Sequence, residues 1–368
     1  MIRVLHVIKS MNHGGAETMI MNIYRNIDRN RIQFDFLCMD DKVGEYDNQI
    51  KKMGGRIFTV SSPDNGRVRN LRQIYRVLKE EKIEIIHTHI SFYSGLVLFV
   101  AYLSGVKKRI CHSHTTNDVR EINIIRRFYN MFSRSLIRIF ANIKLSCGEK
   151  AGKYLYNNSN YTIINNGIDL KQYTSISNKQ VEDLKKELNI SNDEFIIGHV
   201  GRFEKVKNQI YFIEFAKIMK KYIKDFKIIL VGDGTQKQEV EKKVKKEKLE
   251  KYFVFTGVRD DINVCMKMFD IFVMPSLYEG FPLVVVEALA GENICYLSDS
   301  ISKETDIIKD KIEYFNIFEN KQKLVNLIIN NKDKNNTINV IQELKDKGYS
   351  IKNTAEKISQ IYSKDKKG

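Results

Sequence analysis

The stretch MPSLYEGFPLVVVE, residues 274–287, decides how this chain is expected to fold. The apolar run that leads into it, 270–275, is typical of a buried strand, and the apolar residues at its end are typical of a helix. The turn Glu279-Gly-Phe-Pro separates the two. We therefore expect Glu279 in a loop at the carboxyl end of a strand, and Glu287 one or two turns into the next helix.

These two glutamates are candidates for a binding site. Ligands of open α/β sheets bind outside the carboxyl ends of the strands, which is where we expect Glu279 and Glu287 to lie. Two carboxylates at that edge can accept hydrogen bonds from sugar hydroxyls. The alternative is that both residues are solvated surface glutamates.

Short apolar runs alternate with helical patterns along the 368 residues. This alternation predicts parallel strands with right-handed crossovers, and the length favours two domains. We expect α/β domains over 1–172 and 173–349, joined near the polar segment 165–178, and a C-terminal helix 350–366 that packs back on the first domain. Strands are predicted at 2–8, 32–38, 56–60, 83–88, 108–113, 143–147, 161–164, 195–200, 226–231, 252–255 and 271–274.

The composition, 43% hydrophobic and 29% charged, is that of a globular protein. Five scattered cysteines without a C-x-x-C pair favour a reducing cytosol over a disulfide framework or a zinc site. The N-terminus lacks the pattern of a signal peptide. The longest apolar stretch, Phe92 to Leu103, is too short to span a bilayer and predicts a buried helix.

The net charge of +16 is concentrated in the first half of the chain. Residues 1–172 carry 27 Lys and Arg against 15 Asp and Glu, a net +12, whereas 173–368 carry 34 against 30, a net +4. A basic surface fits nucleic acid, anionic lipid or a phosphate-bearing substrate.

Three loops that follow predicted strands carry glycines. Gly14-Gly15-Ala-Glu opens a helix, where backbone N–H groups can meet an anion. Gly201 precedes Arg202 and Lys207, whose guanidinium and ammonium suit a pyrophosphate. Gly232-Asp-Gly forms a further tight turn. Each loop also has a purely structural interpretation, and the absence of G-x-G-x-x-G disfavours a dinucleotide-binding dehydrogenase.

Histidines gather at the ends of predicted strands. His87 and His89 share a strand face, as do His112 and His114, and His199 ends a later strand. No carboxylate or thiolate lies at ligand spacing in the same loops, so we predict no metal site. A hydrogen bond to a polar substrate remains open, as does a satisfied structural role for His87 and His199.

Residues 126–140 can form a basic amphipathic helix. Its apolar side chains are Phe128, Met131, Phe132, Leu136 and Phe140, with Arg127, Arg134 and Arg138 elsewhere around the helix. Such a helix suits an anionic membrane surface. The alternative is an ordinary helix packed by its apolar face.

The order of these motifs is more specific than any one of them. The chain has a GGAE turn after the first strand, then HSH, NGID, G-R-x-x-x-x-K, VGDG, and EGFP followed by a second Glu. Together they resemble the retaining glycosyltransferases of family four, which have the GT-B fold. The resemblance covers about residues 2–300 and is closest to the branch that builds bacterial exopolysaccharide and capsule.

The resemblance implies two Rossmann-like domains that face each other across a cleft, with the nucleotide sugar held mainly by the second. Arg202 and Lys207 would hold the donor pyrophosphate, Glu287 the ribose, and Glu279 the transferred sugar. His114, favoured over His112, would approach that sugar from the acceptor side. The other implied positions are Gly15, Gly201, Gly232, Gly280 and Phe281 for the donor, with His112 and His89 on the acceptor side.

The resemblance also implies partners and a mechanism. A hexose would pass from a nucleotide diphosphate sugar, with a UDP-sugar favoured, to a lipid-linked oligosaccharide, by front-face displacement and without a metal cofactor. The protein would be cytoplasmic, on the inner face of the plasma membrane, and would not bind nucleic acid. Glu292-Asn-Ile-Cys replaces the family's usual continuation, and a glycine-rich segment is missing after residue 300, so uridine and guanosine both remain open.

Two other functions remain open. A nucleotide-sugar epimerase of the same fold would not need a basic membrane-facing helix. A nucleic-acid-binding protein would interleave aromatic and basic residues on one platform, whereas here the basic residues mostly fall on predicted helix surfaces.

Overall fold

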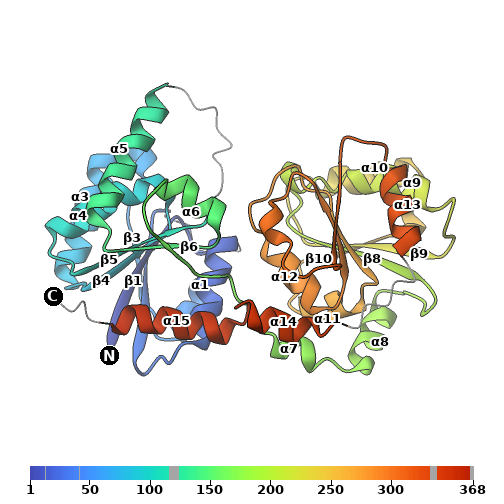
Figure 1. The fold of residues 1–368 in the computed structure, drawn as a ribbon, viewed down its shortest axis with the longest axis horizontal. Helices are drawn as coiled ribbons and strands as arrows, with labels where there is room; N and C mark the ends of the chain where they lie inside the picture. Colours follow the sequence, from blue (N-terminus) through green and yellow to red (C-terminus); the bar gives the residue numbers. More distant parts are fainter. Residues whose placement is uncertain (13, 41, 116–123, 332–337, 365–368) are drawn as a thin grey trace. The chain divides into compact units, whose positions relative to one another are not determined.

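The computed structural model describes residues 1–12, 14–40, 42–115, 124–331 and 338–364. The chain divides into two compact units, Met1–Gly167 with Gly348–Gly368, and Ile168–Lys347 (Figure 1). Each unit is built around its own parallel sheet.

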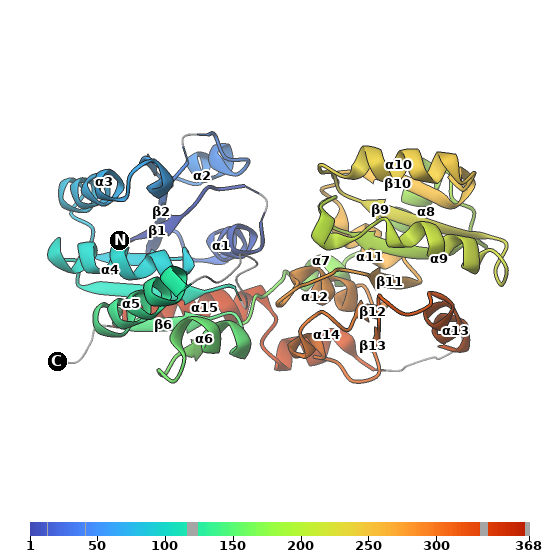
Figure 2. The same cartoon turned by 90° about the horizontal axis from the view of Figure 1, so that it is seen from above.

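The first unit, here called the N-terminal domain, has a seven-stranded sheet in the order β3-β2-β1-β4-β5-β6-β7. Helices α1, α2 and α15 cover one face, and α3, α4, α5 and α6 cover the other (Figure 2). The strands are β1 Ile2–Ile8, β2 Ile32–Cys38, β3 Ile57–Thr59, β4 Ile85–Thr88, β5 Lys108–Ser113, β6 Ile143–Ser146 and β7 Thr162–Ile163. The helices are α1 Gly15–Asn26, α2 Asp47–Lys52, α3 Arg67–Glu80, α4 Ser94–Leu103, α5 Ile124–Phe140, α6 Glu149–Tyr156 and α15 Ile351–Ser363.

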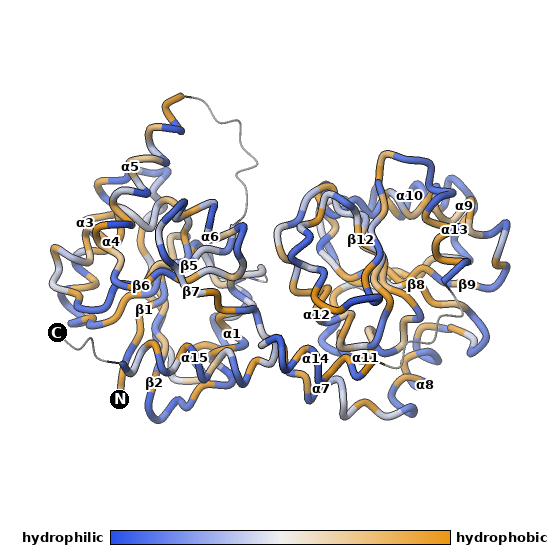
Figure 3. Tube along the Cα trace, in the orientation of Figure 1, coloured by the Kyte–Doolittle hydropathy of each residue, from blue (hydrophilic) through white to orange (hydrophobic). Residues whose placement is uncertain are grey.

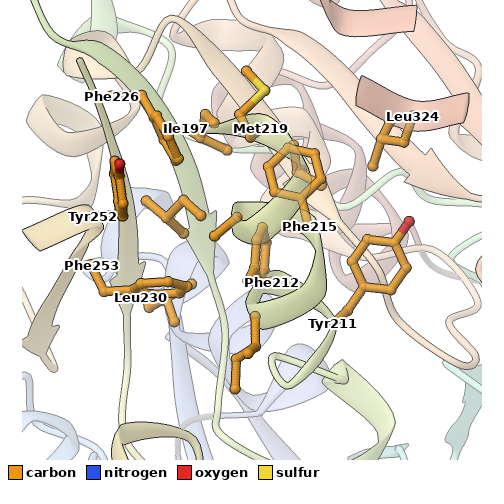
Figure 4. Close-up of a cluster of buried hydrophobic side chains, with 14 of the residues drawn as sticks. Ile197, Tyr211, Phe212, Phe215, Met219, Phe226, Leu230, Tyr252, Phe253 and Leu324 are labelled. Carbon is orange, nitrogen blue, oxygen red and sulfur yellow. The ribbon is translucent and has the colours of Figure 1, made fainter. Parts of the chain in front are cut away.

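The second unit, here called the C-terminal domain, has a six-stranded sheet in the order β10-β9-β8-β11-β12-β13. In its core, Phe212 and Phe215 of α9 pack against Ile197 and Leu230 of the central strands (Figure 4). The strands are β8 Phe195–Val200, β9 Phe226–Val231, β10 Phe253–Gly257, β11 Ile271–Met274, β12 Ile294–Ser298 and β13 Ile312–Phe315. The helices are α7 Lys171–Thr174, α8 Asn178–Glu187, α9 Tyr211–Met219, α10 Lys237–Lys246, α11 Ile262–Met268, α12 Leu283–Ala290, α13 Gln322–Asn331 and α14 Val340–Asp346.

The predicted fold class, two parallel α/β domains, is confirmed. All eleven predicted strands occur, six of them with the predicted bounds. The sequence analysis missed β12 and β13, which lie towards one edge of their sheet. Both are short, and β13, Ile-Glu-Tyr-Phe, interrupts its apolar run with a charge.

The C-terminal helix α15 is part of the N-terminal domain. Its residue Tyr362 is buried in the core, and its ring lies edge-on to Phe34. The Lys108 ammonium donates to the carbonyls of Ile361 and Tyr362 near the end of this helix, at 3.2 and 2.6 Å. Of the predicted range 350–366, residues 365–366 lie outside the described residues.

Among the described residues, no helix combines the length and the hydrophobicity needed to cross a bilayer. The predicted buried helix at 92–103 is α4, preceded by a 3-10 turn at Ser91–Tyr93. It is buried on one side only, because Phe99, Tyr102 and Leu103 are exposed.

Candidate functional site

Lys207 lies on a 3-10 turn in the loop that follows β8, and neighbouring loops hold this loop in place. Phe203 N–H donates to the Asp233 carbonyl in the loop after β9, at 2.8 Å. On the other side, Leu277 N–H donates to the Val206 carbonyl at 2.8 Å, which ties the loop after β11 to the same turn. The strand order β9-β8-β11 brings these three loops to one edge of the sheet.

The structure joins two residues that the sequence analysis selected separately. The Lys207 ammonium lies 2.6 Å from a carboxylate oxygen of Glu279, and the side chains are 20% and 19% exposed. The pair fixes a cation beside a carboxylate at the carboxyl ends of β8 and β11. An ammonium has three N–H donors, so Lys207 can keep Glu279 and still donate to an anion.

Glycine is required where the loops after β8 and β9 meet. Gly232 has a φ of +133°, and a Cβ there would lie 2.3 Å from the Gly201 carbonyl oxygen. A Cβ on Gly201 would lie 3.5 Å from Cδ of Lys207, so the lysine side chain passes along this glycine. The close approach of the two loops therefore requires glycine at position 232, whereas a Cβ on Gly201 would make only ordinary contacts. Arg202, which follows Gly201 in the same loop as Lys207, is exposed.

Glu287 lies on α12, in the position expected from the sequence. Burial raises the pKa of its carboxyl group to about 7. Within the described parts of the chain, no hydrogen bond or ion pair engages this carboxylate. A partly exposed carboxyl group without protein partners is suited to bond a hydroxyl of a ligand. Gly280 and Phe281, both half-buried, lie in the loop that leads into this helix.

In the N-terminal domain, Gly15 is the first residue of α1, and Gly14 precedes it. A Cβ on Gly15 would meet no atom within 4 Å, so the packing of the domain does not require glycine there. The open space leaves the start of α1 accessible to a ligand.

Five histidines of the N-terminal domain come together in space. His6 Nδ1 lies 3.0 Å from His89 Nε2, and His89 Nδ1 lies 2.8 Å from His114 Nε2, which makes a chain of three imidazoles. His87 and His112 lie beside them with their rings stacked. His6, His87 and His112 are buried, whereas His89 and His114 are partly exposed. Of the two histidines weighed for contact with a sugar, His114 is therefore the accessible one.

Burial keeps these imidazoles neutral. It lowers the pKa of His6 to about 3 and of His114 to about 4, and it holds the pKa values of His87, His89 and His112 well below the usual range. A neutral imidazole has one N–H donor and one acceptor nitrogen. The proton positions along the chain of three are therefore linked: if His6 donates to His89, then His89 donates to His114.

His199, at the end of β8, has a structural role. Its Nδ1 lies 2.9 Å from the Val273 carbonyl, which can only accept, so the proton is on Nδ1. Burial lowers its pKa to about 4. The ring therefore joins β8 to β11 beneath the Lys207 loop.

Two family descriptions match this chain. Residues 180–364 match Glycosyl transferases group 1, and residues 13–172 match Glycosyltransferase Family 4. The chain belongs to the family 4 glycosyltransferases. The predicted enzyme class and family are thereby confirmed.

Curated relatives of this glycosyltransferase match it over most of their length. It is 38% identical to a putative glycosyltransferase, EpsF, of Bacillus subtilis over 83% of this chain and 81% of that one. It is 28% identical to the capsular polysaccharide biosynthesis glycosyltransferase CapH of Staphylococcus aureus, over 83% and 84%. It is also 28% identical to an Escherichia coli UDP-Gal:α-D-GlcNAc-diphosphoundecaprenol α-1,3-galactosyltransferase, over 80% and 79%.

Solved structures share the fold of this glycosyltransferase. Anabaena HepE in complex with UDP superposes with a TM-score of 0.79 at 17% identity, covering 99% of this chain and 100% of that one. Sucrose-phosphate synthase from Thermosynechococcus elongatus superposes with a TM-score of 0.74 at 17% identity, covering 98% of each chain. The predicted GT-B fold is confirmed.

Two features of the glycosyltransferase escaped the sequence analysis. His6 was not a candidate, although strand order offered the signal: in a doubly wound sheet β1 adjoins β4, and His6 pairs in register with His87. The ring nitrogens of His6, His87 and His89 consequently lie within 4.8 Å of one another. The ion pair between Lys207 and Glu279 was also missed, because 72 residues separate them and no local pattern links the loops after β8 and β11.

Proposed function

We propose that this glycosyltransferase moves a hexose from a nucleotide diphosphate sugar to a growing, lipid-linked cell-surface polysaccharide, with retention of anomeric configuration. The observation that carries the proposal is the Lys207–Glu279 ion pair, held by loops at the carboxyl ends of β8 and β11. A UDP-sugar is the favoured donor, since the E. coli relative is named for UDP-Gal and Anabaena HepE binds UDP.

The charges suit departure of a nucleoside diphosphate. As the sugar–phosphate bond breaks, negative charge develops on the pyrophosphate, and a fixed cation stabilises that state more than the ground state. Lys207 and Arg202 supply the cations. Glu279 holds Lys207 in position and offers its remaining acceptor capacity to a hydroxyl of the transferred sugar. Glu287 accepts hydrogen bonds from the ribose.

The retaining step is a front-face displacement. In it the acceptor hydroxyl attacks as the pyrophosphate leaves, and a phosphate oxygen takes the hydroxyl proton. His114 contacts the sugar from the N-terminal domain, and its hydrogen bond to His89 fixes the orientation of its ring. The anomeric configuration of the initial product, read by NMR, tests retention. An inverted product would rule this step out.

A lipid-linked acceptor resides in a membrane, so the glycosyltransferase must act at a membrane surface. The E. coli and Campylobacter jejuni relatives are named for diphospho-undecaprenol substrates, which carry both a pyrophosphate and a lipid. The net +12 of residues 1–172 suits that anionic acceptor. We therefore propose that the glycosyltransferase works on the cytoplasmic face of the plasma membrane.

A panel of nucleotide sugars tests the proposal. Purified protein is mixed with each UDP-sugar and GDP-sugar, and thermal unfolding and slow hydrolysis are measured. One donor should raise the unfolding temperature and be hydrolysed. If no nucleotide sugar does either, the proposal is wrong.

Replacing Glu287 by glutamine should weaken nucleotide binding. The amide loses charge-assisted bonding to ribose, worth about 1.5–3 kcal/mol at most. Because the carboxyl pKa is raised to about 7, wild-type affinity should fall as the pH drops through that value, and Glu287→Gln should lose this dependence. Calorimetric titration with UDP and GDP measures both effects.

A matched control for this variant is Glu182→Gln, which removes an exposed carboxylate from α8. It should bind nucleotide as wild type does. Equal UDP and GDP affinities in wild type, Glu287→Gln and Glu287→Ala would show that the ribose assignment is wrong.

Activity should persist after dialysis against EDTA, because Lys207 and Arg202 supply the cations that a metal would otherwise provide at the pyrophosphate. Initial rates with and without added magnesium or manganese check this. Complete loss of activity that either metal restores would contradict it. An EDTA effect on unfolding temperature alone would instead report a metal held by the histidines.

A further inference from the structure

Helix α5 packs into the N-terminal domain by a face that mixes polar and apolar side chains. Asn130, Ser133 and Ile137 are its buried residues, spaced as one face of a helix. On α4, a Cβ added to Gly95 would lie 2.7 Å from the Ser133 carbonyl oxygen, so the two backbones lie in close contact here. An amphipathic helix ordinarily buries most of its large apolar residues, whereas α5 leaves six of them exposed.

Several large apolar residues of α5 face outward. Ile125 is 79% exposed, Phe128 62% and Met131 58%. Figure 3 shows that apolar residues continue to the first turn of α5, where the helix extends beyond α4 and α6. The complete exposed set on this helix is Ile124, Ile125, Phe128, Met131, Phe132 and Ile139.

The neighbouring end of α4 enlarges this surface. Tyr102 and Leu103 are each 54% exposed. The rings of Phe99 and Tyr102 lie 5.1 and 5.2 Å from that of Phe140, so the exposed residues of the two helices adjoin. An apolar patch shared by two helices marks an interaction site on a folded domain.

Among the described residues of α4, of 104–115 and of α5, every charged side chain is basic. No Asp or Glu occurs in α4, in the segment 104–117, or between Ile124 and Gly148. Arg127 and Arg138 on α5, and Lys107 after α4, are exposed. A bilayer with anionic headgroups complements both the basic charge and the apolar residues of these two helices.

We propose that the exposed face of α5, together with the end of α4, is the surface by which this glycosyltransferase docks on an anionic bilayer. This docking proposal rests on the proposed function, which requires a membrane-borne acceptor. Phe128, Met131 and Phe132 enter the boundary between headgroups and acyl chains, and Arg127 and Arg138 bind the headgroups. The helix lies in the plane of the membrane, because 17 residues with four arginines cannot span it.

Not every cation near α5 takes part. Arg134 donates to the Tyr154 carbonyl at 2.8 Å, with its guanidinium over the Phe92 ring. Arg109 donates to the Phe140 carbonyl at 2.7 Å, and Lys108 to carbonyls of α15. These three residues hold the domain together, so charge reversal there would test folding and not docking.

The chain contains no tryptophan, so one introduced indole reports insertion cleanly. Phe128→Trp and Phe132→Trp are each titrated with vesicles of phosphatidylcholine alone, or of equal parts phosphatidylcholine and phosphatidylglycerol. We expect a blue shift of emission and quenching by brominated lipid only with the anionic vesicles. Phe318→Trp, on an exposed residue of the C-terminal domain, should show neither.

Flotation with the same vesicles compares matched charge reversals. Arg127→Glu with Arg138→Glu should weaken binding roughly tenfold or more. Lys242→Glu with Lys246→Glu, the same charge change on α10, should leave binding near wild type. Wild-type binding should also fall as salt rises, since exposed charges are screened over about 8–10 Å.

Each outcome bears on one claim. If the α5 and α10 pairs bind anionic vesicles equally, or if the indole signals do not change, docking through α5 is overturned. A blue shift without vesicles that grows with protein concentration would show a second copy covering the face, which also overturns it. Nucleotide binding by the same variants is measured without lipid, so failure of the donor site and failure of the docking surface are told apart.

Discussion

Replacing Lys207 by alanine should lower turnover by roughly 10²–10³-fold, the effect of losing one preorganised donor to developing charge. Lys207 is the cation that the fold fixes, because it is paired with Glu279 at 2.6 Å and carried by a turn bonded to two other loops. The substitution lies in a loop, so the domain should still fold. Release of nucleoside diphosphate under saturating donor measures the effect, with thermal unfolding as a check.

Controls for this prediction lie in the same loop. Lys205→Ala removes an exposed lysine two residues away and should leave turnover close to wild type. Arg202→Ala should lower turnover as Lys207→Ala does, because both cations are assigned to the pyrophosphate. Glu279→Gln should mainly lower turnover and spare nucleotide affinity. Unchanged turnover in both Lys207→Ala and Arg202→Ala would remove these cations from the mechanism.

Acid should destabilise the glycosyltransferase by several kcal/mol between about pH 7.5 and pH 5, a large part of a typical folding free energy. Burial lowers the pKa of His6 to about 3, and those of His87 and His112 lie well below the usual range. The unfolded chain therefore binds protons below about pH 6.5 that the native state does not. Stability is complete above that pH and falls as the pH approaches the native pKa values, by about 2 kcal/mol per histidine at pH 5.

Denaturant unfolding at a series of pH values checks this prediction. His112→Leu is the informative variant, because it removes a buried imidazole that has no hydrogen-bond partner among the described residues. The variant should show a shallower fall of stability with acid than wild type. A wild-type stability that is flat over this range, or a variant with the full slope, would contradict the neutral buried histidines.

The sequence predicts the strand positions well because a buried parallel strand is a continuous apolar run. Loops that follow such strands share one edge of the sheet, which is why Lys207, Glu279 and Glu287 could be selected. Their pairing could not be predicted, since contacts between loops depend on strand order and on side-chain direction. Gly232 illustrates this: its motif was visible, but its contact with Gly201 was not.

Helix α5 shows a second limit of sequence patterns. Periodicity identifies an apolar face but not which face meets the core. Gly95 on α4 determines which face of α5 packs inward. Because Gly95 has no side chain, the backbone at Ser133 can lie against it, and Phe128 stays exposed to solvent. Arg134 is similar: it counts as a surface charge in the sequence, yet its guanidinium lies over the Phe92 ring.

The most direct test of the account is transfer itself. Purified protein is incubated with a radiolabelled nucleotide sugar, chosen by the donor panel, and with a membrane extract that contains lipid-linked oligosaccharide. Label in the organic-extractable fraction is then measured for wild type, Lys205→Ala and Lys207→Ala. The account predicts label in the lipid fraction with wild type and Lys205→Ala, and a loss of roughly 10²-fold or more with Lys207→Ala. Transfer by Lys207→Ala at the wild-type rate, or no transfer by wild type from any nucleotide sugar, would contradict it.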